Sequence, residues 1–262
     1  MIIKSRENKL YKMCKSLSLK KFRDKLGLYV VEGEKLVLEA IDKGKAFQII
    51  CNYEKNLEDG YKKDGHVFME GKLFKELTHT ETDQGIIAVV RKDNLNFDEF
   101  LKVAEDKNLL VLDRLQDPGN VGTILRTADA AGYGGIIGIK GTVDFYSPKV
   151  VRAAANSLIR VPIFMAESED EAISIATKAN CLIVGSNVGK ELTNYRPLKE
   201  KDIWKFDRNI ALVLGNEGGG VSRRLLEKCH ITTKIPMKSG VDSLNASVAA
   251  GILVYELGYN ID

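Results

Sequence analysis

The sequence predicts an α/β protein with a smaller N-terminal α/β domain and a larger C-terminal domain built on a parallel sheet. Two observations support this fold class. The first 95 residues alternate short strand-like runs with helical ones. From residue 108 onward the strand-like runs are apolar at nearly every position and are separated by helical segments, which is typical of a parallel sheet covered on both faces. A chain of 262 residues is long enough to form both cores.

The N-terminal part contains four candidate strands and two candidate helices. The strands are expected at 28–33 (LYVVEG), 46–51 (AFQIIC), 66–70 (HVFME) and 85–91 (GIIAVVR). Between the first two, EKLVLEAIDKG places Leu36, Val37, Ala40 and Ile41 on one helical stripe and ends at Gly44, a residue type that commonly terminates helices. GKLFKELT predicts a second, shorter helix.

A polar and weakly helical stretch, residues 92–108, separates the two parts and is interpreted as the connector. It sets the expected boundaries: a domain at 1–95, a linker at 96–107 and a second domain at 108–262. Six strands are expected in the second domain, at 109–113, 135–139, 160–164, 181–186, 210–215 and 231–237. Ligands of such sheets bind beyond the carboxyl ends of the strands. The loops after the first, fifth and sixth strands are therefore the candidate site.

Composition excludes several classes of protein. No apolar run approaches the roughly 18 residues that span a membrane, and no apolar segment follows the basic N-terminal residues, so no secretion signal is expected. The four cysteines lie far apart without a metal-binding rhythm, which favours reduced thiols in a cytoplasmic protein and predicts no metal. His66 and His79 lie in the first half of the chain, and nothing in the sequence pairs them with a nucleophile. A Ser-His-Asp or Cys-His hydrolase is therefore not expected.

Positive charge is concentrated at the N-terminus. Residues 1–25 contain nine Lys and Arg against two Asp and Glu, a local net charge of +7, whereas the whole chain carries +3. A basic segment on a nearly neutral body suits contact with a polyanion. The alternative is a solvated helix face.

The first candidate loop is QDPGNVGTILRTADAAG, residues 116–132. Pro118-Gly119 breaks the strand, and Asn120 is a candidate N-cap for the helix that follows. Gly122 and Arg126 are interpreted as lying off the apolar stripe and stacked on one side, where Arg126 and the free N–H groups of the first turn would favour an anion. The alternative is a helix–helix contact at Gly122 and a surface ion pair at Arg126.

The other two candidate loops are LVLGNEGGGVS (212–222) and IPMKSGVDSLNASVAAGILVYEL (235–257). The glycine-rich loop fits neither the dinucleotide fingerprint nor a P-loop, and its one charged group is Glu217. In the third stretch, Asp242 or Ser243 is expected to begin a helix with almost no polar face, so that helix must be buried under the sheet or against a second subunit. A flexible turn and a helix cap are the alternative readings of these two loops.

Together the three loops resemble the signature of the SpoU (TrmH-like) family of RNA ribose 2′-O-methyltransferases, within the SPOUT superfamily. N-x-G-x-x-x-R matches Asn120, Gly122 and Arg126, and G-N-E-G matches residues 215–218. I-P-M followed by S-L-N-x-S-V-A matches 235–237 and 243–249, with a departure at Ala246, where the family often has a larger apolar residue. The first hundred residues are more loosely similar to the substrate-binding domain of many members, which has a ribosomal-protein-like fold.

The resemblance implies a deep trefoil knot in the C-terminal domain, against the general rule that chains do not thread loops. It also implies a homodimer and a bound S-adenosylmethionine, held on the knotted loops largely by backbone groups. The cofactor positions carried over to this chain are Leu214, Gly215, Asn216, Gly218, Ile235, Met237 and Leu244.

The same resemblance makes Arg126, Asn120, Glu217, Ser243 and Asn245 the candidate catalytic residues. Because guanidinium is effectively always protonated, our hypothesis is that Arg126 pairs with the phosphate beside the target ribose and stabilises the developing alkoxide. Gly122 would keep the approach open and Asn120 would orient the loop. Glu217 would tether Arg126 or a ribose hydroxyl, and Ser243 and Asn245 would hold the nucleotide.

The resulting expectation is an RNA 2′-O-methyltransferase that acts on ribosomal RNA rather than tRNA, with the basic N-terminus contacting RNA. A tRNA methyltransferase and a non-catalytic RNA-binding or ribosome-assembly factor on the same scaffold are the alternatives. A nicotinamide oxidoreductase is more distant, because the dinucleotide fingerprint is missing.

Overall fold

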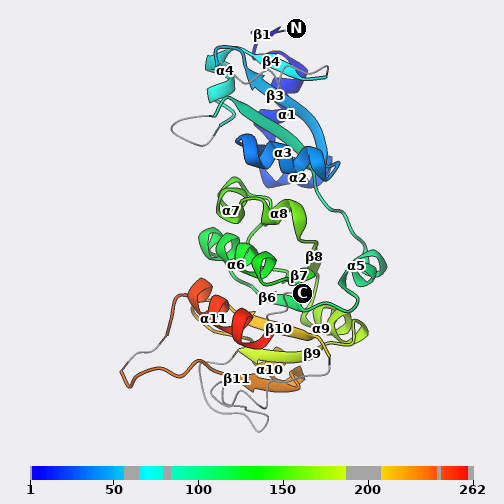
Figure 1. Cartoon of the computed structure of the whole chain (residues 1–262), viewed down its shortest axis with the longest axis vertical. Coiled ribbons are helices and arrows are strands. Elements are labelled where there is room, and N and C mark those ends of the chain that lie inside the picture. The colour runs from blue at the N-terminus through cyan, green and yellow to red at the C-terminus, as the bar shows by residue number, and fades with distance from the viewer. Residues whose placement is uncertain (1, 56–64, 79–83, 187–207, 241–242, 259–262) are drawn as a thin grey trace. The chain divides into compact units, whose positions relative to one another are not determined.

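The computed structural model describes residues 2–55, 65–78, 84–186, 208–240 and 243–258 (Figure 1). The chain separates into two compact units, which are described one at a time. The first unit consists of residues 1–94 and 144–160, and the second of residues 95–143 and 161–262. The segment 144–160 therefore belongs to the first unit, although it lies inside the stretch expected as the C-terminal domain. Within the described ranges, no helix is long and apolar enough to cross a membrane.

The first unit contains a five-stranded mixed sheet in the order β1-β4-β3-β5-β2. The strands are β1 (Ile2–Ile3), β2 (Leu28–Glu32), β3 (Ala46–Asn52), β4 (Val67–Met69) and β5 (Ile86–Arg91). The four expected strands are confirmed, while the two-residue β1, which pairs parallel to β4, was not expected. A strand of two residues is too short to give an alternation pattern in the sequence.

The described part of this unit has six helices beside the sheet: α1 (Lys9–Ser16), α2 (Lys20–Leu26), α3 (Glu34–Asp42), α4 (Gly71–Lys75), α7 (Pro148–Ala154) and α8 (Ser157–Arg160). α3 ends as predicted, because Gly44 adopts a φ of +65° just beyond the helix. That left-handed conformation lets the backbone N–H of Lys45 return to the carbonyl of Ala40. Tyr11, Cys14 and Leu17 of the N-terminal segment are buried in the core of this unit.

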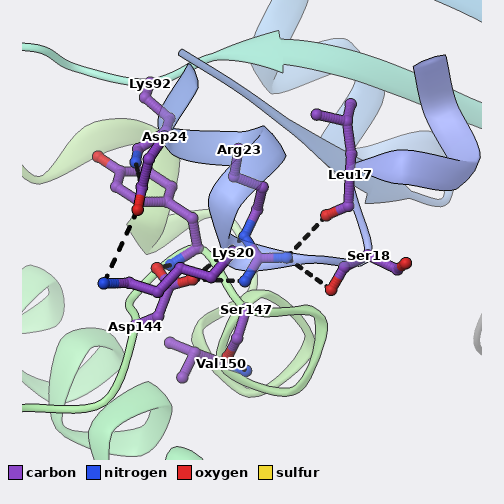
Figure 2. Close-up of polar contacts among 10 residues, drawn as sticks. Leu17, Ser18, Lys20, Arg23, Asp24, Lys92, Asp144, Ser147 and Val150 are labelled. Atoms are coloured by element: carbon purple, nitrogen blue, oxygen red, sulfur yellow. Dashed lines mark hydrogen bonds and ion pairs between the residues drawn. The ribbon is translucent and has the colours of Figure 1, made fainter. Parts of the chain in front are cut away.

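A buried ion pair joins α2 to the turn before α7 (Figure 2). Arg23 donates from Nε and Nη2 to Asp144 Oδ2, at 3.1 and 2.5 Å, and its Nη1 donates to the carbonyl oxygens of Leu17 and Ser18. The Arg23 side chain is only 4% exposed. All three guanidinium nitrogens of Arg23 therefore donate to groups inside the protein. Although Arg23 belongs to the basic N-terminal segment, it is not available to bind a polyanion.

The second unit contains a six-stranded sheet in which all pairs are parallel, as predicted, in the order β11-β9-β10-β6-β7-β8. The strands are β6 (Leu109–Asp113), β7 (Gly135–Ile139), β8 (Ile163–Ala166), β9 (Leu182–Ser186), β10 (Ile210–Gly215) and β11 (Ile231–Thr233). β8 begins later than the expected residue 160, because Pro162 has no N–H to donate to a ladder. β11 ends at Thr233, four residues earlier than expected.

Among the described residues of this unit, five helices cover the sheet: α5 (Phe97–Ala104), α6 (Pro118–Ala130), α9 (Glu169–Lys178), α10 (Arg223–Lys228) and α11 (Ala246–Gly258). α11 packs against α6 and β10, whereas α9 packs against β7, β8 and β9 and is flanked by α5 and α10. α5 lies in the expected linker, yet Phe100 and Ala104 are fully buried in the core of this unit. An Asn96–Glu99 capping box starts α5.

The sheet has its topological switch point between β6 and β10. From β6 the chain adds β7 and then β8 on one side, and it later places β10, β9 and β11 on the other. The last residues of the two central strands, Asp113 and Gly215, lie opposite each other in the ladder. Ligands of open parallel sheets bind at such a point, and the first and second candidate loops both start there.

Candidate active site

The first loop begins α6 differently from the expectation. Asp117, not Asn120, is the N-cap: its Oδ1 accepts from the backbone N–H of Asn120 at 2.7 Å, and Pro118 is the first helical residue. Proline is favoured there because that position needs no N–H partner. The prediction of Asn120 as the cap was wrong. Because Asp117 caps the helix, the side chain of Asn120 can make other contacts.

Gly122 and Arg126 differ in exposure, although they are four residues apart on α6 and therefore neighbours along the helix. Gly122 is buried together with Val121, Ile124 and Leu125, whereas Arg126 is exposed. The interpretation of Gly122 as an open approach to Arg126 is therefore not supported. Among the residues that the structure describes, no hydrogen bond or ion pair holds Arg126, and its guanidinium is available to an anion.

The glycine-rich loop requires glycine at its first position. A Cβ added to Gly215 would lie 1.9 Å from the backbone carbon of Gly220 and 2.0 Å from the nitrogen of Val221. The loop closes on itself, because Asn216 and Gly220 exchange two backbone hydrogen bonds of 3.2 and 3.0 Å. Gly220 has a φ of +64°, a conformation that residues with a side chain rarely adopt.

Asn216 fills the inside of this loop. Its Oδ1 accepts from the backbone N–H groups of Gly218 and Gly219, at 3.1 and 2.6 Å. Such a side-chain-to-backbone turn is characteristic of asparagine. The loop is therefore a defined turn, and the alternative of a flexible connection is not supported.

The third loop starts α11 with Asn245. Its Oδ1 accepts from the backbone N–H groups of Ser247 and Val248, at 2.9 and 3.4 Å, which is the hydrogen bonding of an N-cap. The expected start at Ser243 was wrong, and Asp242 lies outside the described residues. Ser243 and Leu244 are exposed just before the helix.

Hydrogen bonds between side chains connect the three loops. Asn120 Nδ2 donates to Glu217 Oε1 at 2.9 Å, and Asn245 Nδ2 donates to Asn120 Oδ1 at 3.0 Å. One residue from each loop takes part in this chain. Three of the five expected catalytic residues are thus in direct contact, and Glu217 is joined to Asn120 rather than to Arg126.

A pocket of about 710 Å³ lies beside this chain of hydrogen bonds. All seven expected cofactor positions line it, together with Glu217 and Ser243. Asn120, Arg126 and Asn245 are not among the lining residues. The volume lies within the range of roughly 300–1,000 Å³ typical of small-molecule sites, and its mixture of leucine, isoleucine and methionine side chains with glycine backbone fits a nucleoside cofactor.

Sequence reasoning missed part of the lining. The missed residues are Ser186, Gly219, Gly220, Val221, Arg223, Leu226, Lys234, Ala246, Ala249 and Leu253. Ser186 could have been found, because it ends β9 at the same edge of the sheet. Arg223 carried no signal of its own, since it stands in an ordinary surface helix of six residues.

The parallel sheet, with a pocket formed by loops at the carboxyl ends of its central strands, defines an α/β enzyme. More particularly, the chain belongs to the SpoU rRNA methylase family, whose profile matches residues 107–255. Residues 8–88 match an MRM3-like substrate binding domain.

Similar proteins span the same length. The 23S rRNA (guanosine(2553)-2′-O)-methyltransferase RlmP of Bacillus subtilis is 33% identical, over 97% of this chain and 98% of the relative. The AdoMet-bound rRNA methyltransferase of Sinorhizobium meliloti superimposes with a TM-score of 0.83 at 29% identity, covering 98% of this chain and 97% of that one. AviRb of Streptomyces viridochromogenes, in complex with AdoMet, has a TM-score of 0.82 at 25% identity, covering 96% and 97%.

Proposed function

We propose that this protein transfers a methyl group from S-adenosylmethionine to the 2′-hydroxyl of a ribose in ribosomal RNA. The observation that supports it most directly is the meeting of Asn120, Glu217 and Asn245 beside a cofactor-sized pocket. These residues come from three separate loops, and a packing role alone does not require polar groups of all three to converge. The B. subtilis relative acts on 23S rRNA, which favours large-subunit rRNA as the substrate.

The donor side of the site is the glycine-rich loop and the segment after β11. Leu214 and Ile235 offer apolar contact, while Gly215 and Gly218, which have no side chains, let a ligand approach the loop backbone closely. When bound, S-adenosylmethionine supplies an activated methyl group: its S–CH₃ bond breaks as the ribose oxygen gains the methyl and loses its proton. Leu244 and Met237, both partly exposed, line the same pocket.

The acceptor side is assigned to Arg126 and the Asn120–Glu217–Asn245 chain. Arg126 is exposed and would pair with the phosphate next to the target ribose, where it also stabilises negative charge on the 2′-oxygen. Because a guanidinium does not release its proton in proteins, a water molecule or a phosphate oxygen takes the proton. Asn120 holds Glu217 in place, and Ser243 and Asn245 bind the nucleotide.

A homodimer formed through α11 is part of the proposal. Ala250, Leu253 and Val254 bury one face of this helix. On the other face Val248, Ile252 and Tyr255 are 52%, 36% and 46% exposed, at the i, i+4 and i+7 spacing of a continuous stripe. An apolar stripe of this kind is suited to a second copy of the chain.

The proposal also includes a trefoil knot in the C-terminal domain and a cytoplasmic location for the protein. The glycine-rich loop and the segment around Ile235 and Leu244 line one pocket, which is where the family resemblance puts the knotted loops. The four cysteines are buried and none of them forms a disulfide, as suits a reducing compartment.

RNA contact by the basic N-terminus is assigned to the exposed lysines Lys4, Lys9, Lys21 and Lys25. Arg23 is excluded, since it is buried against Asp144, and Arg6 is paired with Glu76. Replacing the four lysines with glutamine should weaken RNA binding and flatten its salt dependence. Deleting residues 1–25 is a poor test, because it would remove Tyr11, Cys14 and Leu17 from the core.

The test of the proposed function is transfer of labelled methyl from S-adenosylmethionine to separate pools of rRNA and tRNA, with the modified position then mapped. Arg126→Ala should bind the donor normally in calorimetry and lose about 10²-fold or more in turnover. Arg126→Lys keeps the charge but loses the paired donors, so normal turnover in this variant would contradict the bidentate contact. Failure of the wild-type chain to bind S-adenosylmethionine would favour the RNA-binding factor instead.

A further inference from the structure

Asp113 is a buried carboxylate that belongs to none of the three motifs. It is the last residue of β6, it is 1% exposed, and it lies opposite Gly215 in the ladder with β10. A charged group in such a place is unfavourable unless it is paired and hydrogen-bonded. The groups that pair with the Asp113 carboxylate therefore indicate its structural role.

The two carboxylate oxygens of Asp113 are held differently. Oδ2 accepts a hydrogen bond from the backbone N–H of Ser222 at 2.8 Å, whereas Oδ1 lies 2.7 Å from Nη2 of Arg114 in an ion pair but accepts no hydrogen bond among the described residues. The same Nη2 donates to Glu169 Oε1 at 2.8 Å, and that oxygen also accepts from Ser222 Oγ at 2.9 Å. Four residues thus form a closed network around Ser222.

The network fixes the far end of the glycine-rich loop. Gly215 enters the loop paired with the backbone of Asp113, and Ser222 leaves it bound to the Asp113 carboxylate. Between them, the backbone of Gly220 and Val221 passes so close to Gly215 that no Cβ would fit. Asp113 therefore contacts both ends of the loop, on either side of this narrow crossing.

We propose that Asp113 is a positioning residue that keeps the glycine-rich loop in the shape that receives the methyl donor. This inference rests on the proposed function, which places the donor in the pocket lined by that loop. Asp113 itself is not among the residues that line the pocket, so it acts through Ser222 and the loop. Its removal should weaken donor binding and leave the RNA contacts intact.

The first test is Asp113→Asn in the full-length chain, which preserves shape but removes the charge that faces Arg114. Loss of the ion pair with Arg114 and of the charge on the acceptor of the Ser222 N–H predicts a rise of about tenfold in the Kd and KM for S-adenosylmethionine. The kcat at saturating donor and the KM for RNA should stay near the wild-type values. A general loss of folding would not produce this split.

A second pair of variants isolates the bond itself. Ser222 has a φ of −59°, which proline adopts without strain. Ser222→Pro removes the N–H that Asp113 accepts, whereas Ser222→Ala keeps the N–H and removes only the hydroxyl. Donor binding should therefore be clearly weaker in Ser222→Pro than in Ser222→Ala.

Glu167→Gln is the matched control. It makes the same carboxylate-to-amide change at an exposed ion pair with Lys140, outside the Asp113 network, and donor binding should not change. Equal donor affinity in wild-type protein and Asp113→Asn would overturn the positioning role, as would a parallel loss of donor affinity, RNA affinity and thermal stability. If wild-type protein binds no donor, it is the proposed function that fails.

Discussion

The side-chain amide of Asn120 donates a 2.9 Å hydrogen bond to the carboxylate of Glu217, 97 residues further along the chain. Asn245 donates to the oxygen of the same amide. The bond is possible because Asp117 caps α6 and leaves Asn120 free. The candidate site therefore depends on a helix cap that is not itself part of any motif.

Coupling between Asn120 and Glu217 is the first prediction. Asn120→Ala and Glu217→Ala should each reduce kcat by about 10- to 100-fold, since each breaks a hydrogen bond to a charged group. The double variant should lose much less than the product of the two effects. Steady-state rates of the four proteins in a double-mutant cycle measure this, and full additivity would mean that the two residues act independently.

Glycine at position 215 is the second prediction. Gly215→Ala places a Cβ against the backbone of Gly220 and Val221, and overpacking of this kind destabilises by about 1–3 kcal/mol. Donor binding should fall with it, because the loop must open. Gly218→Ala is the control for stability alone, because Gly218 itself lines the pocket; the nearest atom to its Cβ is 4.0 Å away. Thermal unfolding should separate the two variants, and an equal loss of stability would refute the steric argument.

The exposed stripe of α11 gives the third prediction. Val248→Glu with Ile252→Glu should convert a dimer into a monomer, because two charges cannot be buried unpaired at an interface. Neither side chain is among the buried residues of α11, so circular dichroism should show an intact fold. Analytical ultracentrifugation measures the result. A wild-type chain that sediments as a monomer would refute the dimer directly.

The buried Arg23–Asp144 pair gives the fourth prediction (Figure 2). Asp144→Asn leaves Arg23 charged inside the protein without its counter-ion, which should lower the free energy of unfolding by about 3–5 kcal/mol. Asp24→Asn is the matched control, because Asp24 pairs with Lys92 at a half-exposed site, where a loss of about 1 kcal/mol or less is expected. Denaturant melts compare the two, and similar losses would mean that the burial of Arg23 is energetically unimportant.

His230 gives a pH dependence near neutrality. Desolvation of the ring and the charge of Arg208 lower its pKa below the ordinary 6.5. Its Nδ1 accepts from the backbone N–H of Ile183 at 2.9 Å, which requires the neutral ring. Because the pKa of His230 is lower in the folded state, the unfolded chain binds a proton at this ring more readily than the folded protein does. The contribution of neutral His230 to folding stability is therefore complete above the unfolded pKa and is lost as the pH falls toward the folded pKa.

The measurement is the Tm at about pH 7.5 and about pH 5.5, two values that bracket the pKa of histidine in the unfolded chain. Wild-type protein should be less stable at the lower pH. His230→Asn retains an acceptor for Ile183 but does not titrate, and this part of the pH dependence should disappear. An unchanged pH profile in that variant would show that the ring does not contribute.

Features that depend on residues close together in the sequence could be predicted from it, whereas contacts between residues far apart in the sequence could not. The strands β6, β7 and β10 begin and end where their apolar runs do, because a strand buried on both faces must be apolar throughout. Gly215 and the lining residues Ile235 and Leu244 were predicted through motif matches, which keep their spacing along the chain. β1 was missed, because pairing with β4 needs a partner 66 residues away.

What the sequence by itself determined is therefore the order of elements, the parallel sheet and the three loops. Only the tertiary structure decided that Asn120 is free to join Glu217 and Asn245, that Gly122 is buried while Arg126 is exposed, and that Arg23 is withdrawn from the surface by Asp144. The physical reason is that local patterns follow from backbone geometry and the burial of neighbouring side chains. The partner of a polar side chain is chosen only when distant segments are brought together, and nothing in the spacing of the sequence encodes that distance.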